Sequence, residues 1–254
     1  MASLSDRFEH ALTPAAVRSY LAEFISTFFF VFAANGSAMS SRKMTPESPM
    51  LDQFGLVATA IATAFALSVA VYVAVNVSGG HVNPAVTFGM AVGGHISIPL
   101  AIFYCMSQML GSIIACMVLK FMTVSQNVPV HGIPDEMTGF GASILEGVMT
   151  FALVYTVYAA GDPRRGAFGT IGPLVIGFIA GANVLASGPF TGGSMNPAYS
   201  FGSGVVGGSF KNQAVYWIGP LIGAGVASVV YDNLVFPAQS PEDSIRGITD
   251  GIGV

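Results

Sequence analysis

Two short segments contain the residues best suited to chemistry, because each places an Asn-Pro-Ala triplet behind a pair of glycines. They are residues 78–89 (SGGHVNPAVTFG) and residues 191–202 (TGGSMNPAYSFG). Asn favours the N-cap of a helix, and Pro favours the first helical position, where an N–H would have no partner. Each triplet therefore predicts a helix N-terminus, with an Asn amide that can donate to a polar solute. The residues are Asn83, Pro84 and Ala85, and Asn196, Pro197 and Ala198.

The helix predicted after each proline is short. The segment from Asn to Gly, residues 83–89 or 196–202, has seven residues, which corresponds to roughly 10 Å of helix. A bilayer core is about 30 Å thick. We therefore expect two half-helices that enter a membrane without crossing it.

The composition indicates a membrane protein, because 53% of the 254 residues are hydrophobic and only 9% are charged. The net charge of −4 gives nucleic acid no basic patch to bind. Cys105 and Cys116 fall in one apolar segment, about 16 Å apart along a helix, and so are too distant to pair. The residue pattern predicts no metal site, cofactor or catalytic set.

Six apolar segments are long enough to be membrane spans. They cover residues 18–39, 54–77, 98–119, 142–160, 169–186 and 214–231. Residues 1–17 are a polar lead without the features of a signal peptide. Residues 120–139 form a polar connection that could fold over an opening. We expect a single domain over residues 1–254.

The two halves of the chain repeat each other. Each half, about residues 18–120 and 141–231, has one carboxylate in its first span, Glu23 or Glu146, and one Asn-Pro-Ala triplet. Three spans per repeat invert the second copy, so a pseudo-two-fold axis lies in the membrane plane. The predicted fold is an all-α polytopic membrane protein with six transmembrane helices and two re-entrant half-helices that meet near the midplane.

A pore is the expected consequence, because irregular backbone at membrane depth must line a wet cavity or be buried in protein. Two helix N-termini aimed at the centre disfavour cations, protons included. A single Asn-Pro pair would be interpreted as an ordinary helix cap. Two at matching repeat positions favour a role in the pore.

Glu23 and Glu146 allow two interpretations, a proton relay or a structural role. A relay needs a chain of titratable groups, and the sequence contains none around them. One carboxylate per repeat could instead accept N–H groups from each re-entrant loop. The structural role is the prediction, and Gln108 in the third span is assigned a similar one.

The doubled triplets, the Ser-Gly-Gly-His-Val-Asn-Pro-Ala-Val-Thr-Phe-Gly run and Gly-Gly-Ser-Met-Asn-Pro-Ala resemble the aquaporin (major intrinsic protein) family. The segments 22–27, 150–159 and 181–186 resemble the plant tonoplast intrinsic proteins within it. The resemblance covers nearly the whole chain. It implies a homotetramer with lipid around it and one pore per subunit that passes water and small neutral solutes without enzymatic activity. The expected site is the vacuolar membrane (tonoplast), and the alternatives are another internal membrane or the plasma membrane.

The resemblance also implies a selectivity filter of four side chains, which fall on Thr63, Val184, Gly193 and Tyr199. Tonoplast members usually have His at the first of these positions and usually have Arg at the last. This chain resembles a divergent subgroup that lacks both. His131 looks like a loop His that some members add to the filter, and the alternative is a surface residue. In the filter, His131 would add a cation when it is protonated between about pH 5 and 7.

Replacing Arg by Tyr removes a permanent cation and most of its donors. We expect this change to favour less polar solutes such as urea, ammonia, boric acid, glycerol or hydrogen peroxide. Tyr is no smaller than Arg, however, so a ring across the pore would narrow it. The alternatives to a channel are a closed or structural member of the same fold and a secondary transporter, which would need midplane coupling groups. An enzyme built on Ser78 and His81 would lack an acid partner.

The orientation follows from a slight bias in positive charge. Lys and Arg divide five to four between the two sides, with the larger number on the side of the termini. The termini are therefore predicted to be cytoplasmic. His131 would then face the vacuolar lumen.

Overall fold

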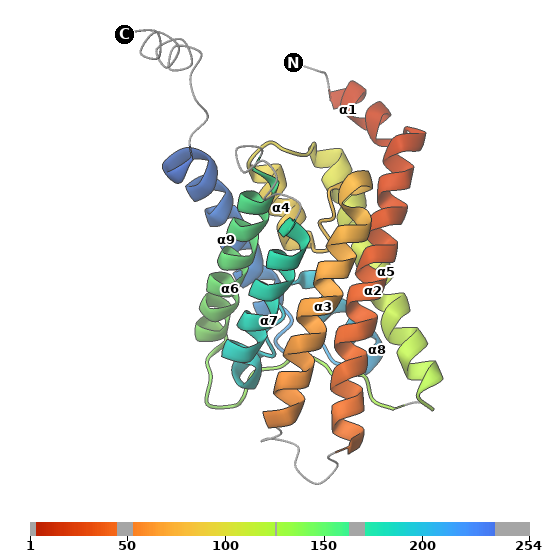
Figure 1. The fold of residues 1–254 in the computed structure, drawn as a ribbon, viewed down its shortest axis with the longest axis vertical. Coiled ribbons are helices and arrows are strands. Elements are labelled where there is room, and N and C mark those ends of the chain that lie inside the picture. Colours follow the sequence, from red (N-terminus) through yellow and green to blue (C-terminus); the bar gives the residue numbers. More distant parts are fainter. Residues whose placement is uncertain (1–3, 45–52, 125, 163–170, 237–254) are drawn as a thin grey trace.

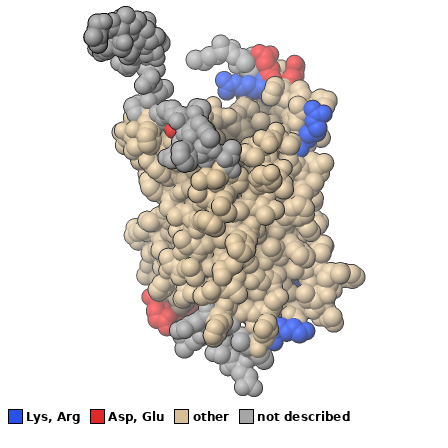
Figure 2. All heavy atoms as spheres, viewed as in Figure 1, with Lys and Arg blue, Asp and Glu red and all other residues tan. Residues whose placement is uncertain are grey.

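The computed structural model describes residues 4–44, 53–124, 126–162 and 171–236. Six helices among these residues are long and apolar enough to cross a membrane, as the sequence predicts. They are α2 (Pro14–Met44), α3 (Gln53–Ser78), α5 (Ile98–Met122), α6 (Gly139–Gly161), α7 (Gly172–Thr191) and α9 (Val215–Val229), which continues as a π-helix over Val230–Val235. Figure 2 shows charged side chains at the two ends of the molecule, with an uncharged band between them. The protein is an integral, multi-pass membrane protein.

The half-helices are α4 (Pro84–Val92) and α8 (Pro197–Gly207), and they enter from opposite ends of the bundle (Figure 1). The chain order of two long helices, a half-helix and a long helix occurs twice. This arrangement confirms the predicted fold class, including the inverted repeat.

Both half-helices are longer than predicted, with nine and eleven residues. Gly89 and Gly202 lie inside them instead of ending them. A Cβ at Gly202 would lie 2.1 Å from the Ser112 hydroxyl oxygen, and one at Gly89 would lie 3.1 Å from the Ala224 carbonyl oxygen. These glycines therefore allow close approach to a neighbouring helix.

Other predicted bounds also need correction. The fifth span is predicted over residues 169–186, but α7 continues to Thr191, and residues 169–170 lie outside the described residues. The polar lead contains a short helix, α1 (Leu4–Ala11), and the first span begins at Pro14 and ends at Met44. Its 31 residues correspond to about 46 Å of helix, more than a bilayer core requires. The polar residues at the end of α2 therefore extend the helix beyond the membrane instead of starting a loop.

Glycines also set the contacts between the long helices. Gly177 and Gly181 of α7 lie against Ala64 of α3, and a Cβ at either residue would come within 3 Å of atoms in α3. Gly219 and Gly223 of α9 lie against Gly147 of α6 in the same way. Small residues allow such close approach in membranes, where no hydrophobic force drives helices together.

Candidate functional site: a candidate pore

The two Asn-Pro-Ala triplets meet at the centre of the bundle. Each Asn caps its own half-helix, because Asn83 Oδ1 accepts from the Ala85 N–H at 2.8 Å and Asn196 Oδ1 accepts from the Ala198 N–H at 3.0 Å. Each Nδ2 also donates across the repeat axis: Asn83 to the Met195 carbonyl at 2.8 Å, and Asn196 to the Val82 carbonyl at 3.0 Å. An amide nitrogen carries two N–H groups, so each Asn has one left for a solute.

The residues that accept these bonds have unusual backbone geometry. Val82 has φ 57° and Met195 has φ 53°, in the left-handed region that β-branched and bulky residues rarely adopt. Such strain costs on the order of 1–3 kcal/mol per residue and persists only where the surroundings enforce it. The sequence carries no signal for this geometry, which occurs at the position before Asn in both repeats.

Glu23 holds the strained loop before Asn83 in place in the first repeat. Its carboxylate accepts from the Ser78 hydroxyl at 2.6 Å, the His81 N–H at 2.9 Å and the Val82 N–H at 2.7 Å. The Gln108 amide donates to the same carboxylate at 2.7 Å. Glu23 itself is fully buried.

Glu146 makes the matching contacts in the second repeat. It accepts from the Thr191 hydroxyl at 2.6 Å, the Ser194 N–H at 3.1 Å and the Met195 N–H at 2.7 Å. Both carboxylates therefore hold the strained loops that precede the Asn residues. This geometry favours the structural role over a relay.

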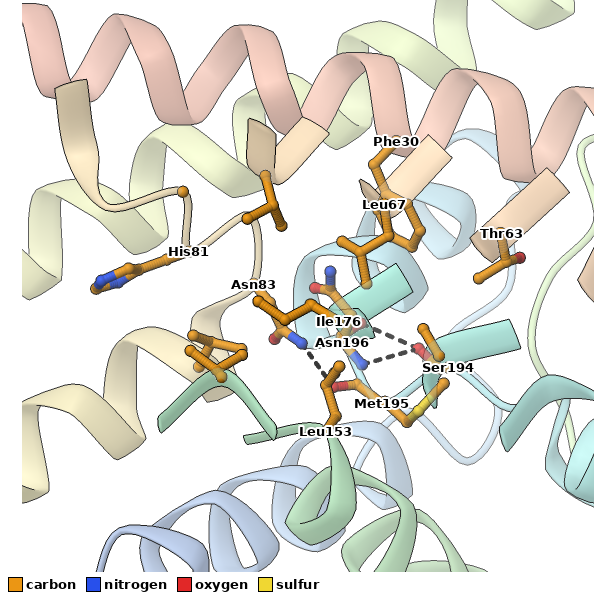
Figure 3. Close-up of a pocket in the computed structure, with 15 residues that line it drawn as sticks. Phe30, Thr63, Leu67, His81, Asn83, Leu153, Ile176, Ser194, Met195 and Asn196 are labelled. Carbon is orange, nitrogen blue, oxygen red and sulfur yellow. Dashed lines mark hydrogen bonds between the residues drawn. The ribbon is translucent and has the colours of Figure 1, made fainter. Parts of the chain in front are cut away.

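A cavity of about 20 Å³ lies beside the two Asn amides. This volume holds about one water molecule. Figure 3 shows Asn83 and Asn196 together at its centre, with Phe30 and Leu67 on one side and Leu153 on another. The wall is mostly apolar, and its polar side chains are Thr63, His81, Asn83, Ser194 and Asn196.

A second cavity of about 340 Å³, here called the outer cavity, opens at the end of the bundle where α2 ends. Its wall includes Val184, Tyr199 and His131. Phe30 lines the central cavity, and its ring lies edge-on to Tyr199 with centroids 5.3 Å apart. The Phe30–Tyr199 pair therefore lies between the two cavities.

The predicted filter positions are divided between these cavities. Thr63 lines the central cavity, and its buried hydroxyl has no hydrogen-bond partner among the described residues. Val184 and Tyr199 line the outer cavity. Gly193 lies against Val184, because a Cβ added at Gly193 would be 3.1 Å from the Val184 Cα. Sequence reasoning missed Phe30 and Arg42, which also line the cavities, because only the packing of α2 brings them there.

His131 lies against Tyr199, one of the predicted filter positions. Its ring is 4.5 Å from the Tyr199 ring and 5.5 Å from the Tyr216 ring. The side chain is half-buried, and its Nδ1 atom is buried with no partner among the described residues. Burial lowers the pKa of His131 to about 4. The predicted titration between pH 5 and 7 is therefore wrong for this environment, because a desolvated imidazole resists protonation.

Comparisons with known proteins agree with this architecture. The family model described as "Major intrinsic protein" matches residues 10–231. A protein named "Probable aquaporin TIP5-1" from Arabidopsis thaliana is 59% identical over 252 residues, 99% of this chain and 97% of that protein. "Aquaporin TIP2-1" from the same plant is 53% identical over 228 residues, 89% of this chain and 91% of that protein.

A solved structure shares the fold. The aquaglyceroporin from Plasmodium falciparum superposes with a TM-score of 0.76 at 20% sequence identity, over 90% of this chain and 99% of that chain. At this identity the likeness concerns the fold alone.

Proposed function

The chain belongs to the major intrinsic protein family, and we propose that it is a passive channel for water and small neutral solutes. One observation carries the proposal: the two Asn amides lie beside a cavity that holds about one water molecule. Each amide has one N–H bonded across the repeat axis and one left for a solute. A solute would exchange hydrogen bonds with these donors as it passes in single file.

Ion exclusion follows from the same centre. The N-termini of α4 and α8 each carry roughly half a positive charge and point at the central cavity. Such dipoles oppose cations and protons without a titratable group. The apolar wall offers an ion little to replace its hydration shell.

The filter has no fixed cation to orient strongly polar solutes, so it favours less polar ones. Thr63, Val184, Gly193 and Tyr199 offer hydroxyls and apolar surface but no charge. Urea, ammonia and boric acid fit this chemistry, and glycerol and hydrogen peroxide are related candidates. We further propose the vacuolar membrane as the site, in line with the TIP names of the relatives, and a homotetramer as the assembly, which the family resemblance implies.

The test is water flux through purified protein in liposomes after an osmotic step, followed by stopped-flow light scattering. We expect shrinkage well above that of empty liposomes. Asn196→Leu should reduce the flux strongly, because it removes a donor and adds bulk beside a cavity of about 20 Å³. Asn233→Leu is the matched control, since Asn233 is exposed and its amide donates to the Val229 carbonyl four residues earlier in the chain. Shrinkage equal to that of empty liposomes would exclude the water channel.

A closed or structural role is the second candidate. The observation that favours it is the Phe30–Tyr199 ring pair between the central and outer cavities. If the rings seal this point, water flux stays at the background of empty liposomes in the parent protein. It then appears when Tyr199 is truncated.

A further inference from the structure

The outer cavity has a positive charge that neither the Asn-Pro-Ala triplets nor the filter positions supply. Asn35, Ala38 and Arg42 are spaced three and four residues apart, so they share one face of α2, and all three line this cavity. Arg42 belongs to the part of α2 that extends past the membrane. Among the described residues that line the cavity, Arg42 is the one with a permanent charge.

No Asp or Glu is among the described residues that line this cavity with Arg42. Burial holds the pKa of His131 at about 4, so this ring is neutral near pH 7. The ion pairs of the described residues join His95 to Asp232 and Lys211 to Asp135, and neither includes Arg42. Tyr199 lies within electrostatic reach of Arg42.

We propose that Arg42 is a selectivity residue, which repels cations at the outer mouth where the filter itself has no fixed charge. The inference rests on the proposed channel function and deepens it. A cavity with low-dielectric walls focuses the field of one charge, so cations are depleted inside it. Neutral solutes do not respond to this potential.

The position of Arg42 allows its charge to act on cations without narrowing the constriction at Tyr199. An Arg at position 199 would both repel cations and fill the constriction, whereas Arg42 lines the outer cavity from the end of α2. Arg42 is also exposed, so added salt should screen its effect over a Debye length of about 10 Å at 0.1 M. Removal of its charge should therefore change ion selectivity without changing water flux.

The first experiment measures the potential of the cavity directly. Thr59→Cys puts a thiol on the wall of the outer cavity, in a background with Cys105→Ser and Cys116→Ala. The rates of reaction with a cationic and an anionic methanethiosulfonate are compared at low salt. With Arg42→Gln, the anionic-to-cationic rate ratio should fall on the order of threefold or more. The fall should disappear at 1 M salt, where the Debye length is about 3 Å.

Two variants serve as controls. Lys43→Gln removes a charge from the same turn of α2 at a position outside the cavity wall, so the ratio should stay unchanged. Arg42→Lys keeps the charge and should keep the ratio. A ratio that responds equally to Arg42→Gln and Lys43→Gln, or to neither, would overturn the proposal.

The second experiment measures flux in liposomes, with methylammonium as the cation and urea as the neutral solute. Arg42→Gln should raise the flux of methylammonium relative to water, while the urea-to-water ratio stays constant. A changed thiol ratio with unchanged methylammonium flux would overturn the selectivity role. If the parent protein conducts water but Arg42→Gln changes neither the thiol ratio nor the methylammonium flux, the role of Arg42 is overturned and the proposed function stands. Absence of water flux overturns the proposed function, and the role of Arg42 with it.

Discussion

Tyr199 is the side chain on which we expect conduction to depend most directly, because its ring contacts both Phe30 and His131 at the boundary of the two cavities. Tyr199→Gly removes this ring, and we expect water and urea flux to rise together several-fold. Phe201→Gly is the matched control on the same half-helix, since the Phe201 ring packs on Phe210 and Trp217. Stopped-flow measurements on both variants give the comparison. Unchanged flux in Tyr199→Gly would mean that the constriction lies elsewhere.

Tyr199→Arg addresses solute choice at the same position. A fixed cation with several donors favours water over less polar solutes. We therefore expect the ratio of urea flux to water flux to fall. An unchanged ratio would show that position 199 is not part of the filter. The assignment of Thr63, Val184 and Gly193 to the filter would then be wrong as well.

His131 gives a prediction for pH. Its pKa of about 4 lies below the ordinary value of 6.5, so folding favours the neutral ring. Flux should therefore be constant between pH 5 and 7 on the loop side and change only as pH approaches 4. The stabilising effect of the neutral ring is complete above pH 6.5 and is lost as pH falls from 6.5 towards 4.

The measurement is flux at several pH values on the loop side, in the parent protein and in His131→Ala. The change near pH 4 should be absent in the variant. A transition between pH 5 and 7 that His131→Ala abolishes would show that the ring is hydrated and titrates normally.

At the scale of elements, Glu146 connects α6 to the loop before α8. Glu146→Ala leaves the donors on Thr191, Ser194 and Met195 unpaired in a buried place. The expected loss of stability is roughly 3–5 kcal/mol, comparable to removing one partner of a buried charged pair. Thermal unfolding in detergent should shift down by about 10 °C. Glu9→Ala, at an exposed position of α1, should leave the transition unchanged.

A proton relay would give a different result for the same residue. In that case Glu146→Gln, which keeps the shape of the side chain, would alter proton-coupled flux while the unfolding temperature stayed near that of the parent. The structural role predicts the opposite: the unfolding temperature falls, while proton-coupled flux does not change. Both variants are therefore measured in both assays.

The contact between α6 and α9 depends on backbone approach at glycines. A Cβ at Gly223 would lie 2.1 Å from the Gly147 carbonyl oxygen, whereas a Cβ at Gly161 would meet no atom of the described residues within 4 Å. Gly223→Ala should therefore destabilise the protein by about 1–3 kcal/mol. Gly161→Ala should leave stability equal or slightly higher, because Ala favours a helix. Equal effects of the two variants on thermal unfolding would contradict the close approach.

At the scale of the whole molecule, the two repeats of the chain together enclose the central cavity, because Asn83 of the first repeat and Asn196 of the second meet there. If the protein assembles as the proposed tetramer, each subunit should therefore conduct independently. Liposomes that contain parent and Asn196→Leu chains in mixed tetramers should lose water flux in proportion to the fraction of the variant. A loss much steeper than proportional would indicate a pore shared between subunits.

The sequence by itself determined that the chain folds in a membrane, how many spans it has, that its two halves form an inverted repeat, and that the two Asn-Pro-Ala triplets meet. Apolar runs of bilayer length leave a chain few choices, and an odd number of spans per repeat fixes the inversion. The N-caps at Asn83 and Asn196 also follow from local chemistry, since an Asn before a Pro favours a helix start. Local preference and global fold agree at these points.

Tertiary structure alone decided the rest. The strain at Val82 and Met195 exists because Glu23 and Glu146 hold the loops from helices distant in the sequence. Phe30 reaches the boundary of the cavities, and Arg42 the outer mouth, only through the packing of α2. Burial of His131, and the low pKa that follows, comes from rings on α8 and α9. Each of these properties depends on desolvation or contact between segments far apart in the chain, which the spacing of residues along the sequence does not encode.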